Sequence, residues 1–338
     1  MATISDVAKI AGVSSATVSR VVHNKGKVGD ACRARVKKII AELDYRPNSN
    51  ASALASQKTN TIGVVTPKLS MPFFGSLASG VEKAAREDNY KLLMSNSLYE
   101  TETELAAIES LRQANCKAII LHSEYSDEET LIKLANEIPG LVLVNRYIPK
   151  LSNRCVWLDN LSAAQEASQH LVDNGHQKFA VVTSIYQNRD PGCRVEGIQK
   201  TLAKNNLSLD SNSIEESTAN IEGGEQAVKA LLAKGCKFTA LLAYNDLMAV
   251  GAIHALFEAG LRVPEDVSVI GFDDLLLGVA CRPKLTTMHY PIEEMANYAT
   301  KLAIKLSEEE MPASKQTHLF IAEMIERDSV TVAKNQPL

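Results

Sequence analysis

From Thr61 onward, short runs of aliphatic residues alternate with longer amphipathic stretches, and this alternation restricts the possible folds most strongly. Buried strands are predicted at 62–66, 91–95, 118–121, 141–144 and 155–158, with helices at 74–88, 103–114 and 128–137. The pattern then begins again, with helices at 163–174, 194–205, 224–233 and 247–259 and strands at 179–182, 240–243 and 267–271. Such alternation is typical of parallel sheets covered by helices on both faces. The sequence therefore predicts two doubly wound α/β units with a cleft between them.

Ligands of open α/β sheets bind beyond the carboxyl ends of the strands. The segments at these ends are rich in Asp, Asn, Arg and aromatic residues, and they comprise 68–74, 145–146, 184–194, 244–246 and 272–274. Planar polar groups bond vicinal hydroxyls two at a time, and an aromatic ring packs on the apolar face of a sugar. We therefore expect a sugar ligand. Two alternatives stay open: Asp246 as a helix cap and Asp274 as a solvated residue.

Ahead of this body, residues 3 to 23 have the pattern of two short helices. Thr3 and Asp6 form a helix-entry signal, and Gly12 suits the end of the first helix. Ser14 is expected to cap the second helix, whose valines face those of the first. Two short helices joined by a tight turn form a helix-turn-helix, which a third helix at 32–43 would close into a small core.

The outer face of the second predicted helix suits a major groove. Small side chains there allow close approach, and the planar fork of Arg20 fits guanine O6 and N7. Ser14 and Thr17 are expected to hold phosphates. This outer face consists of Ser15, Ala16, Ser19 and Arg20. The alternative is an ordinary amphipathic helical hairpin with an exposed arginine.

Charge is divided between the two parts of the chain. Residues 1–58 hold ten Lys and Arg against four Asp and Glu, whereas the remainder holds 26 against 36. A basic head is attracted to phosphates, and an acidic body is repelled by them. The six cysteines have no metal-ligand spacing, and no run of eighteen apolar residues appears. We expect a cytoplasmic protein without a metal, a cofactor or a membrane anchor.

A short linker joins head and body. Residues 48–55 could form about two helical turns after Pro47, but a helix of that length is marginal alone. Leu54 on this stretch is an apolar residue without an evident partner. We expect a hinge at 46–60.

The sequence resembles the lactose/galactose repressor (LacI/GalR) family of bacterial transcription regulators over nearly its entire length. The head carries Ile4-x-Asp-Val-Ala-x-x-Ala-Gly-Val-Ser-x-x-Thr-Val-Ser-Arg20, and the body carries Asn145-Arg146, Arg194-x-x-Gly197, Asn245-Asp246, Gly271-Phe-Asp-Asp274 and Pro283-x-Leu-Thr-Thr287. Within the family it is most similar to the galactose repressors, through Asn153-Arg-Cys-x-x-Leu-Asp159, Tyr244-Asn-Asp246 and Tyr290-Pro-Ile292.

The resemblance implies particular site residues. Leu54 takes the position of a wedge between central base pairs, and such wedges kink DNA. The expected DNA-binding residues are Thr3, Ser14, Ser15, Ala16, Thr17, Ser19, Arg20, Asn48, Ala51 and Leu54. The expected effector-binding residues are Phe73, Phe74, Asn145, Arg146, Arg194, Asn245 and Asp273.

The resemblance also implies the domain plan. It consists of a helix-turn-helix domain at 1–45, the hinge at 46–60 and a two-lobed periplasmic-binding-protein-like body at 61–338. The first subdomain is expected at about 61–158 and 291–315, and the second at about 159–288 and 316–332. We expect a homodimer, because the chain lacks a leucine heptad tail like that of the tetrameric branch.

These features predict a sequence-specific repressor of sugar-utilisation genes that binds a palindromic operator and is released by a sugar such as galactose. Alternative effectors are N-acetylglucosamine, another sugar or a purine acting as co-repressor. The segment Ser217 to Gly223 has no aromatic residue to stack on a base, which weakens the purine alternative. A sugar-binding transport protein is a further alternative. An enzyme is disfavoured because the sequence has no G-x-G-x-x-G, P-loop or G-x-S-x-G motif.

Overall fold

The structure is a computed structural model that describes residues 2–22, 24, 26–45, 60–186, 188–308 and 318–334. The chain divides into two compact units, Met1–Thr59 and Asn60–Leu338. In the described residues of the first unit there are three helices: α1 (Ile4–Ala11), α2 (Ser15–Val22) and α3 (Asp30–Glu42).

Capping side chains define where these helices begin and end. Thr3 and Asp6 form a capping box, in which Thr3 Oγ1 accepts from Asp6 N at 3.3 Å and Thr3 N donates to Asp6 Oδ2 at 2.8 Å. Gly12 ends α1 with φ 65°, a left-handed conformation that glycine adopts without strain. Ser14 Oγ then accepts from Thr17 N at the start of α2, as expected.

The apolar faces of the three helices meet in one small core. Val7 from α1, Val18 from α2 and Val36 from α3 are fully buried there. The predicted helix-turn-helix and its third helix are therefore confirmed.

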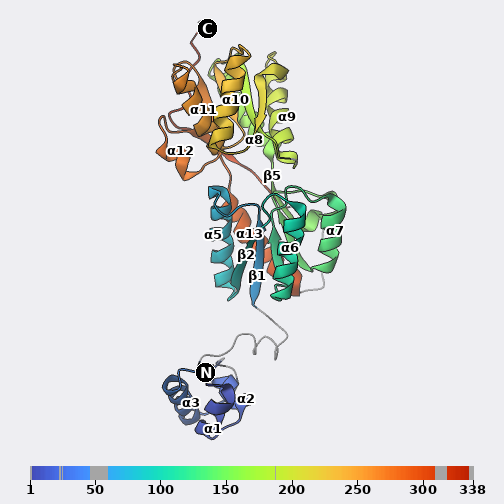
Figure 1. Cartoon of the computed structure of the whole chain (residues 1–338), viewed down its shortest axis with the longest axis vertical. Helices are drawn as coiled ribbons and strands as arrows, with labels where there is room; N and C mark the ends of the chain where they lie inside the picture. The colour runs from blue at the N-terminus through green and yellow to red at the C-terminus, as the bar shows by residue number, and fades with distance from the viewer. Residues whose placement is uncertain are drawn as a thin grey trace. The chain divides into compact units, whose positions relative to one another are not determined.

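The second unit contains two six-stranded sheets, each with its own helices (Figure 1). The first sheet has the order β11-β5-β4-β3-β1-β2 and is parallel throughout. Its strands are β1 (Thr61–Thr66), β2 (Lys91–Asn96), β3 (Ala118–Leu121), β4 (Gly140–Val144), β5 (Cys155–Leu158) and β11 (His318–Phe320). Its helices are α5 (Pro72–Glu87), α6 (Thr101–Gln113), α7 (Glu128–Glu137), the 3₁₀ helix η1 (Pro149–Arg154) and α13 (Ile292–Glu308). We call this set the first subdomain.

The second sheet has the order β12-β10-β9-β8-β6-β7. Its strands are β6 (Phe179–Ser184), β7 (Ile214–Ser217), β8 (Ala240–Ala243), β9 (Ser268–Asp273), β10 (Thr286–His289) and β12 (Glu323–Ile325). Its helices are α8 (Asn160–Asp173), α9 (Arg189–Lys204), the 3₁₀ helix η2 (Ser211–Ser213), α10 (Ile221–Ala233), α11 (Asp246–Glu258) and α12 (Leu276–Ala280). We call this set the second subdomain.

Both sheets are buried on both faces, which explains their continuous apolar strands. In β1, Val64 packs in the cluster that contains α5 and α13, and its neighbour Val65 packs on the side of α6 and α7. In Figure 1 the red α13, late in the chain, lies beside the blue α5, and the two helices are in contact. The predicted architecture of a helix-turn-helix domain and a two-lobed α/β body is thus confirmed.

Three details differ from the expectation. The edge strand β12 pairs antiparallel with β10, so the second sheet is not wholly parallel. The chain crosses between the sheets after β5, after β10 and after β11. The last crossing was expected near residue 316, but it follows Phe320, because β11 still pairs with β5 of the first sheet. The helix expected from Arg194 begins at Arg189, where Asn188 caps it.

Candidate functional site

The outer face of α2 is open to solvent in the first unit. Ser15, Ala16 and Arg20 are exposed, and Ser19 is half-buried. The aliphatic stem of Arg20 runs along Gly26, where an added Cβ would lie 3.4 Å from Arg20 Cδ. Arg20 is exposed, and among the described residues no hydrogen bond or ion pair holds its guanidinium, so it has the reach that base-edge recognition requires.

Three hydroxyl groups expected to contact DNA, those of Thr3, Ser14 and Thr17, already have local partners. Thr3 Oγ1 donates to Asp6 Oδ2 at 2.7 Å, and the hydroxyls of Ser14 and Thr17 lie 3.0 Å apart. Both bonds are exposed, so DNA would have to replace them or share the same hydroxyls. Asn48, Ala51 and Leu54 lie outside the described residues.

In the second unit, Arg194 is the centre of the candidate effector site. It lies in the second turn of α9 and is only 6% exposed. Its Nε donates to Asn160 Oδ1 at 2.8 Å, its Nη1 donates to Tyr244 O, and its guanidinium lies 3.5 Å from the centroid of the Phe272 ring. The partners of Arg194 are therefore neutral oxygens and aromatic faces.

Asp273 stands at the end of β9, beside this arginine. Its φ of 107° is strained for a residue other than glycine, and such strain is often found at functional sites. Burial raises the pKa of Asp273 well above its usual range, and the charge of Arg194 opposes that rise. Within the described residues its carboxyl group makes no hydrogen bond, so it has acceptor capacity for a ligand.

The neighbouring acidic and amide residues have structural roles. Asn245 caps α11, accepting from Met248 N at 2.9 Å, and donates to Ala219 O at 3.2 Å. The capping alternative for Asp246 is wrong, because that side chain is buried and accepts from Leu275 N and Thr287 Oγ1. Asp274 is not merely solvated, since Arg327 and His289 both bond its carboxylate.

The first subdomain contributes Asn145 and an aromatic group. Asn145 Nδ2 donates to Asp190 Oδ2 at 2.7 Å, and its Oδ1 accepts from Tyr290 Oη. The ring of Phe73 meets that of Tyr290 edge-on at 5.0 Å, and Phe74 packs at 4.9 Å from the ring of His122. The bond from Asn145 to Asp190 joins the carboxyl end of β4 to the start of α9, which links the two subdomains.

Not all predicted effector residues take part in this arrangement. Asp190 accepts from both Asn145 and Asn160, and Asn160 in turn accepts from Arg194, so these residues form one connected network. Arg146 instead donates to Ser123 O at 3.3 Å. Among the described residues, no hydrogen bond joins Arg146 or Asn245 to the other predicted effector residues.

Sequence reasoning missed several residues of the cleft. They are Tyr99, His122, Glu124, Asn160, Asp190 and Tyr186. Tyr186 and Asp190 lie in the segment 184–194, which follows the carboxyl end of a predicted strand. His122 and Glu124 directly follow β3. The rule that ligands bind beyond the carboxyl ends of the strands also points to these two residues.

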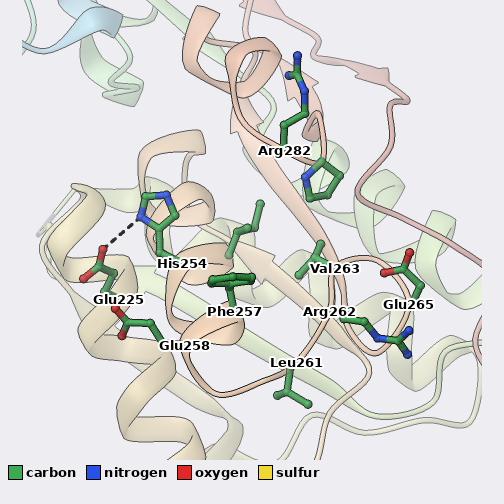
Figure 2. A pocket seen from close by; sticks show the side chains of 11 residues that line it. Glu225, His254, Phe257, Glu258, Leu261, Arg262, Val263, Glu265 and Arg282 are labelled. Carbon is green, nitrogen blue, oxygen red and sulfur yellow. Dashed lines mark hydrogen bonds and ion pairs between the residues drawn. The ribbon is translucent and has the colours of Figure 1, made fainter.

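A separate groove of about 610 Å³ lies on the second subdomain (Figure 2). Its apolar lining includes Phe257, whose side chain is 80% exposed. Charged residues of both signs surround it: Glu225, Glu258, Glu265, His254, Arg262 and Arg282. It contains none of the predicted effector residues, so we regard it as a different surface. Across the described ranges, no helix is long and apolar enough to cross a membrane.

A basic helical head with an exposed recognition face, joined to a two-lobed body with a polar cleft, defines a DNA-binding regulator controlled by a small ligand. Residues 3–48 match the model of bacterial regulatory proteins of the lacI family, and residues 59–320 match periplasmic binding proteins and the sugar-binding domain of the LacI family. The chain belongs to the LacI family of transcription regulators, and the predicted similarity to the galactose repressors is also confirmed.

Its relatives match it along almost their whole length. The chain is 39% identical to the HTH-type transcriptional regulator GalR of Escherichia coli K12 over 331 residues, covering 98% of this chain and 96% of the relative. It is 40% identical to GalS of Salmonella typhimurium LT2, covering 100% and 99%. The solved structure of the Lac repressor dimer bound to operator and an anti-inducer matches with a TM-score of 0.87 at 26% identity, covering 98% of this chain and 99% of that chain. The chain is therefore a DNA-binding transcription regulator with a sugar-binding domain.

Proposed function

We propose that this regulator is a repressor that binds a near-palindromic operator as a homodimer and releases it when a small sugar binds the cleft. The observation that carries the proposal is the network from Asn145 through Asp190 to Asn160 and Arg194, because it connects the ends of both sheets. A ligand changes an equilibrium only by its different affinity for two states. A sugar that replaces these bonds touches both subdomains, so its affinity depends on their arrangement.

Two of the proposed effector side chains are already bonded within the protein. Arg194 donates to Asn160 and Tyr244, and Asn145 bonds Asp190 and Tyr290. A sugar must therefore displace protein hydrogen bonds as it enters. The effector set proposed from the sequence remains Phe73, Phe74, Asn145, Arg146, Arg194, Asn245 and Asp273, to which we add Asp190.

The two-fold symmetry of a homodimer explains why the operator should be near-palindromic. One helix-turn-helix reads few base pairs, and two copies related by a two-fold axis read two half-sites. The head residues expected to touch DNA are those on the outer face of α2, and Leu54 of the hinge is proposed as the wedge in the minor groove. Since operators lie on the bacterial chromosome, the proposed site of action is the cytoplasm.

We further propose that the second copy packs on the groove of Figure 2. Phe257 on α11 and Leu276 on the neighbouring α12 are 80% and 83% exposed, which is unusual for such side chains unless they are covered by a partner. A two-fold interface must complement itself, and this surface carries a protruding ring, a hollow and charges of both signs.

A panel of sugars and purines tests the effector class. Thermal melting of the full chain should rise with one sugar, because a ligand at about 100 times its Kd adds roughly 2.7 kcal/mol of apparent stability. The same sugar should release an operator selected from random duplex DNA in a gel-shift assay. A compound that raised the melting temperature and tightened operator binding would contradict release and assign a co-repressor instead.

A further inference from the structure

Asp273 and Asp274 have backbone conformations that favour glycine. Their φ angles are 107° and 58°, in the left-handed region that other residues adopt rarely and at a steric cost. Asp273 ends β9, and its carboxyl group lies near the charge of Arg194 and makes no hydrogen bond within the described residues. Because the side chain of Asp273 has no bonds that could hold this turn, neighbouring residues must hold it.

The carboxylate of Asp274 is bonded at both oxygens. Arg327 Nη2 donates to Oδ1, and His289 Nδ1 donates to Oδ2 at 3.0 Å. The side chains of Asp274 and Arg327 are only 18% and 16% exposed, so solvent screens this ion pair less than a pair on the surface. Since His289 ends β10 and Arg327 follows β12, Asp274 is held from two neighbouring segments of the sheet.

Arg327 is itself fixed at both ends. Its backbone N donates to Thr286 Oγ1 at 3.0 Å, and its Nη1 donates to Leu285 O at 2.9 Å. Thr286 and Leu285 have no exposed surface. Because a guanidinium carries its donors in one rigid plane, the bond to Leu285 O sets the direction of the donor that reaches Asp274. The buried start of β10 therefore determines where Asp274 lies.

The residue after Asp274 is held as well. Leu275 N donates to Asp246 Oδ2 at 2.7 Å, and Thr287 Oγ1 donates to Asp246 Oδ1 at 2.6 Å. Asp246 is fully buried at the start of α11. The turn is thus bonded at Asp274 and Leu275, whereas Asp273 keeps its carboxyl group available for a ligand.

Two of the groups that hold the turn lie next to connections between the subdomains. The chain leaves β10 at His289 for the first subdomain, and it returns from that subdomain just before β12 and Arg327. A shift of one subdomain against the other would therefore act on the groups that hold Asp273. A ligand bonded to Asp273 would then have different affinities for the two arrangements, which a ligand-controlled switch requires.

We propose that Arg327 is a positioning residue for effector binding. Through Asp274 it holds Asp273 in the strained conformation that presents the carboxyl group of Asp273 to a sugar hydroxyl. Arg327 does not touch the sugar itself. This proposal rests on the proposed function and adds to it a residue outside the effector set.

Hydrogen exchange of the full-length chain tests the hold without a sugar. Arg327→Gln removes the ion pair from one side, and Asp274→Asn removes it from the other and still decides if the first variant does not fold. By mass spectrometry, the amides of residues 272–278 should exchange several-fold faster in both variants, because the bond from Leu275 N to Asp246 opens more often. Exchange in β6 of the same sheet should be unchanged, which separates a local change from general destabilisation.

Lys234→Gln is the matched control, because it also removes a basic residue of the second subdomain from an ion pair. Its partner, Glu215 on β7, has a side chain that is 17% exposed, close to the 18% of Asp274. Among the described residues, neither Lys234 nor Glu215 bonds the turn at 273–275. This variant should leave exchange at 272–278 and sugar affinity unchanged.

Sugar binding separates positioning from a purely structural role. The probes are D-galactose and its deoxy analogues, each lacking one hydroxyl group, in isothermal titration calorimetry. Asp273→Ala identifies the hydroxyl that Asp273 bonds, since removal of that hydroxyl then no longer weakens binding. Arg327→Gln and Asp274→Asn should bind D-galactose about tenfold more weakly, roughly the value of one hydrogen bond. Both should also lose most of the penalty for that same analogue and keep the penalties for the others.

Unchanged exchange at 272–278 in both variants would overturn the proposal. So would faster exchange with unchanged D-galactose affinity, or a loss of affinity that is equal for D-galactose and every analogue. In these cases a sugar that still releases operator from the unmodified chain leaves the proposed function standing. If another sugar of the panel binds in place of D-galactose, its own deoxy analogues are the probes. If no sugar binds the unmodified chain, the sugar effector is wrong, and the role of Arg327 in binding it is wrong as well.

Discussion

At position 194 a single guanidinium joins three parts of the second subdomain. It bonds Asn160 of α8 and the carbonyl of Tyr244 after β8, and it lies over the ring of Phe272 in β9. Asp273, by contrast, makes no hydrogen bond in the described part of the chain. Arg194 and Asp273 are both expected to bind the ligand, but they contribute differently to the stability of the fold.

This difference predicts different outcomes for their variants. Arg194→Ala should lower the free energy of unfolding by about 1 to 3 kcal/mol for each acceptor left unpaired, because Asn160 Oδ1 and the carbonyl oxygen of Tyr244 lose their donor. Asp273→Asn should keep the melting temperature within a few degrees and abolish the ligand response. Urea denaturation and operator release measure the two effects. If Asp273→Asn still responded at the ligand concentration that suffices for the unmodified protein, Asp273 would not contact the effector.

Arg20 leads to a prediction about base reading. Arg20→Ala should weaken binding to the selected operator by roughly 1 to 3 kcal/mol and relax preference at one base pair in each half-site. Lys38→Ala is a suitable control, since Lys38 lies exposed on α3 and pairs with Glu42. Its effect should be small and similar on operator and random DNA. Equal losses on both DNAs for Arg20→Ala would rule out base recognition.

Buried carboxyl groups predict how stability depends on pH. Burial raises the pKa of Glu124 from 4.5 to about 8 and that of Asp246 from 3.8 to about 7. A raised pKa means that the folded state binds more protons than the unfolded state, so this contribution is present at low pH and is lost as pH rises towards 8. His122 acts in the opposite sense below pH 6.5, where the unfolded ring gains a proton first.

The free energy of unfolding should therefore fall between about pH 6.5 and 8. Urea denaturation at several pH values measures this slope. Asp246→Asn should make the slope shallower, whereas Glu109→Gln on the surface of α6 should leave it unchanged. A stability that rose over this pH range would show that these carboxyl groups are ionised in the folded protein.

At the scale of elements, the turn between α1 and α2 sets the orientation of the recognition face. Gly12 has φ 65° and nothing within 4 Å of an added Cβ, so substitution there changes backbone strain alone. Gly12→Ala should destabilise the head by about 1 kcal/mol. Gly29, also without neighbours but with φ −59°, is the N-cap of α3 and provides the control: Gly29→Ser adds a Cβ there and should be neutral or slightly stabilising, because serine is a preferred N-cap residue. Circular dichroism of the head transition in urea compares them, and equal effects would refute the turn argument.

At the scale of the whole molecule, dimerisation determines whether two heads can read one operator. Phe257→Glu would place a charge in the proposed interface and should shift the chain to monomers in sedimentation experiments, with a loss of operator affinity. Val332→Glu serves as the control, because Val332 is 67% exposed outside the groove. If Phe257→Glu stayed dimeric at the same concentrations, the second copy would have to pack elsewhere.

The sequence predicted the major elements because their signals are local. The strands β1, β3 and β4 are continuous aliphatic runs, and α7 lies at the predicted residues, since Asp127 caps it and its apolar residues keep helical spacing. The helix α13 was not predicted. The strands β7, β10, β11 and β12 were not predicted either. Each of these strands has only three or four residues, too few to show a period, and each is a strand because a neighbour is present to pair with it.

The sequence by itself determined the helix-turn-helix, the alternation of strands and helices, the division of charge and the types of residue at the strand ends, because these depend on spacing and composition within short segments. The tertiary structure decided which of those residues meet. Asn145 and Asp190 are separated by 45 positions, and Glu124 and Asn188 by 64, and no periodicity encodes such pairings. The burial of Glu124 and Asp246, and with it their raised pKa values, also exists only once the chain has folded around these groups, because desolvation depends on every surrounding atom.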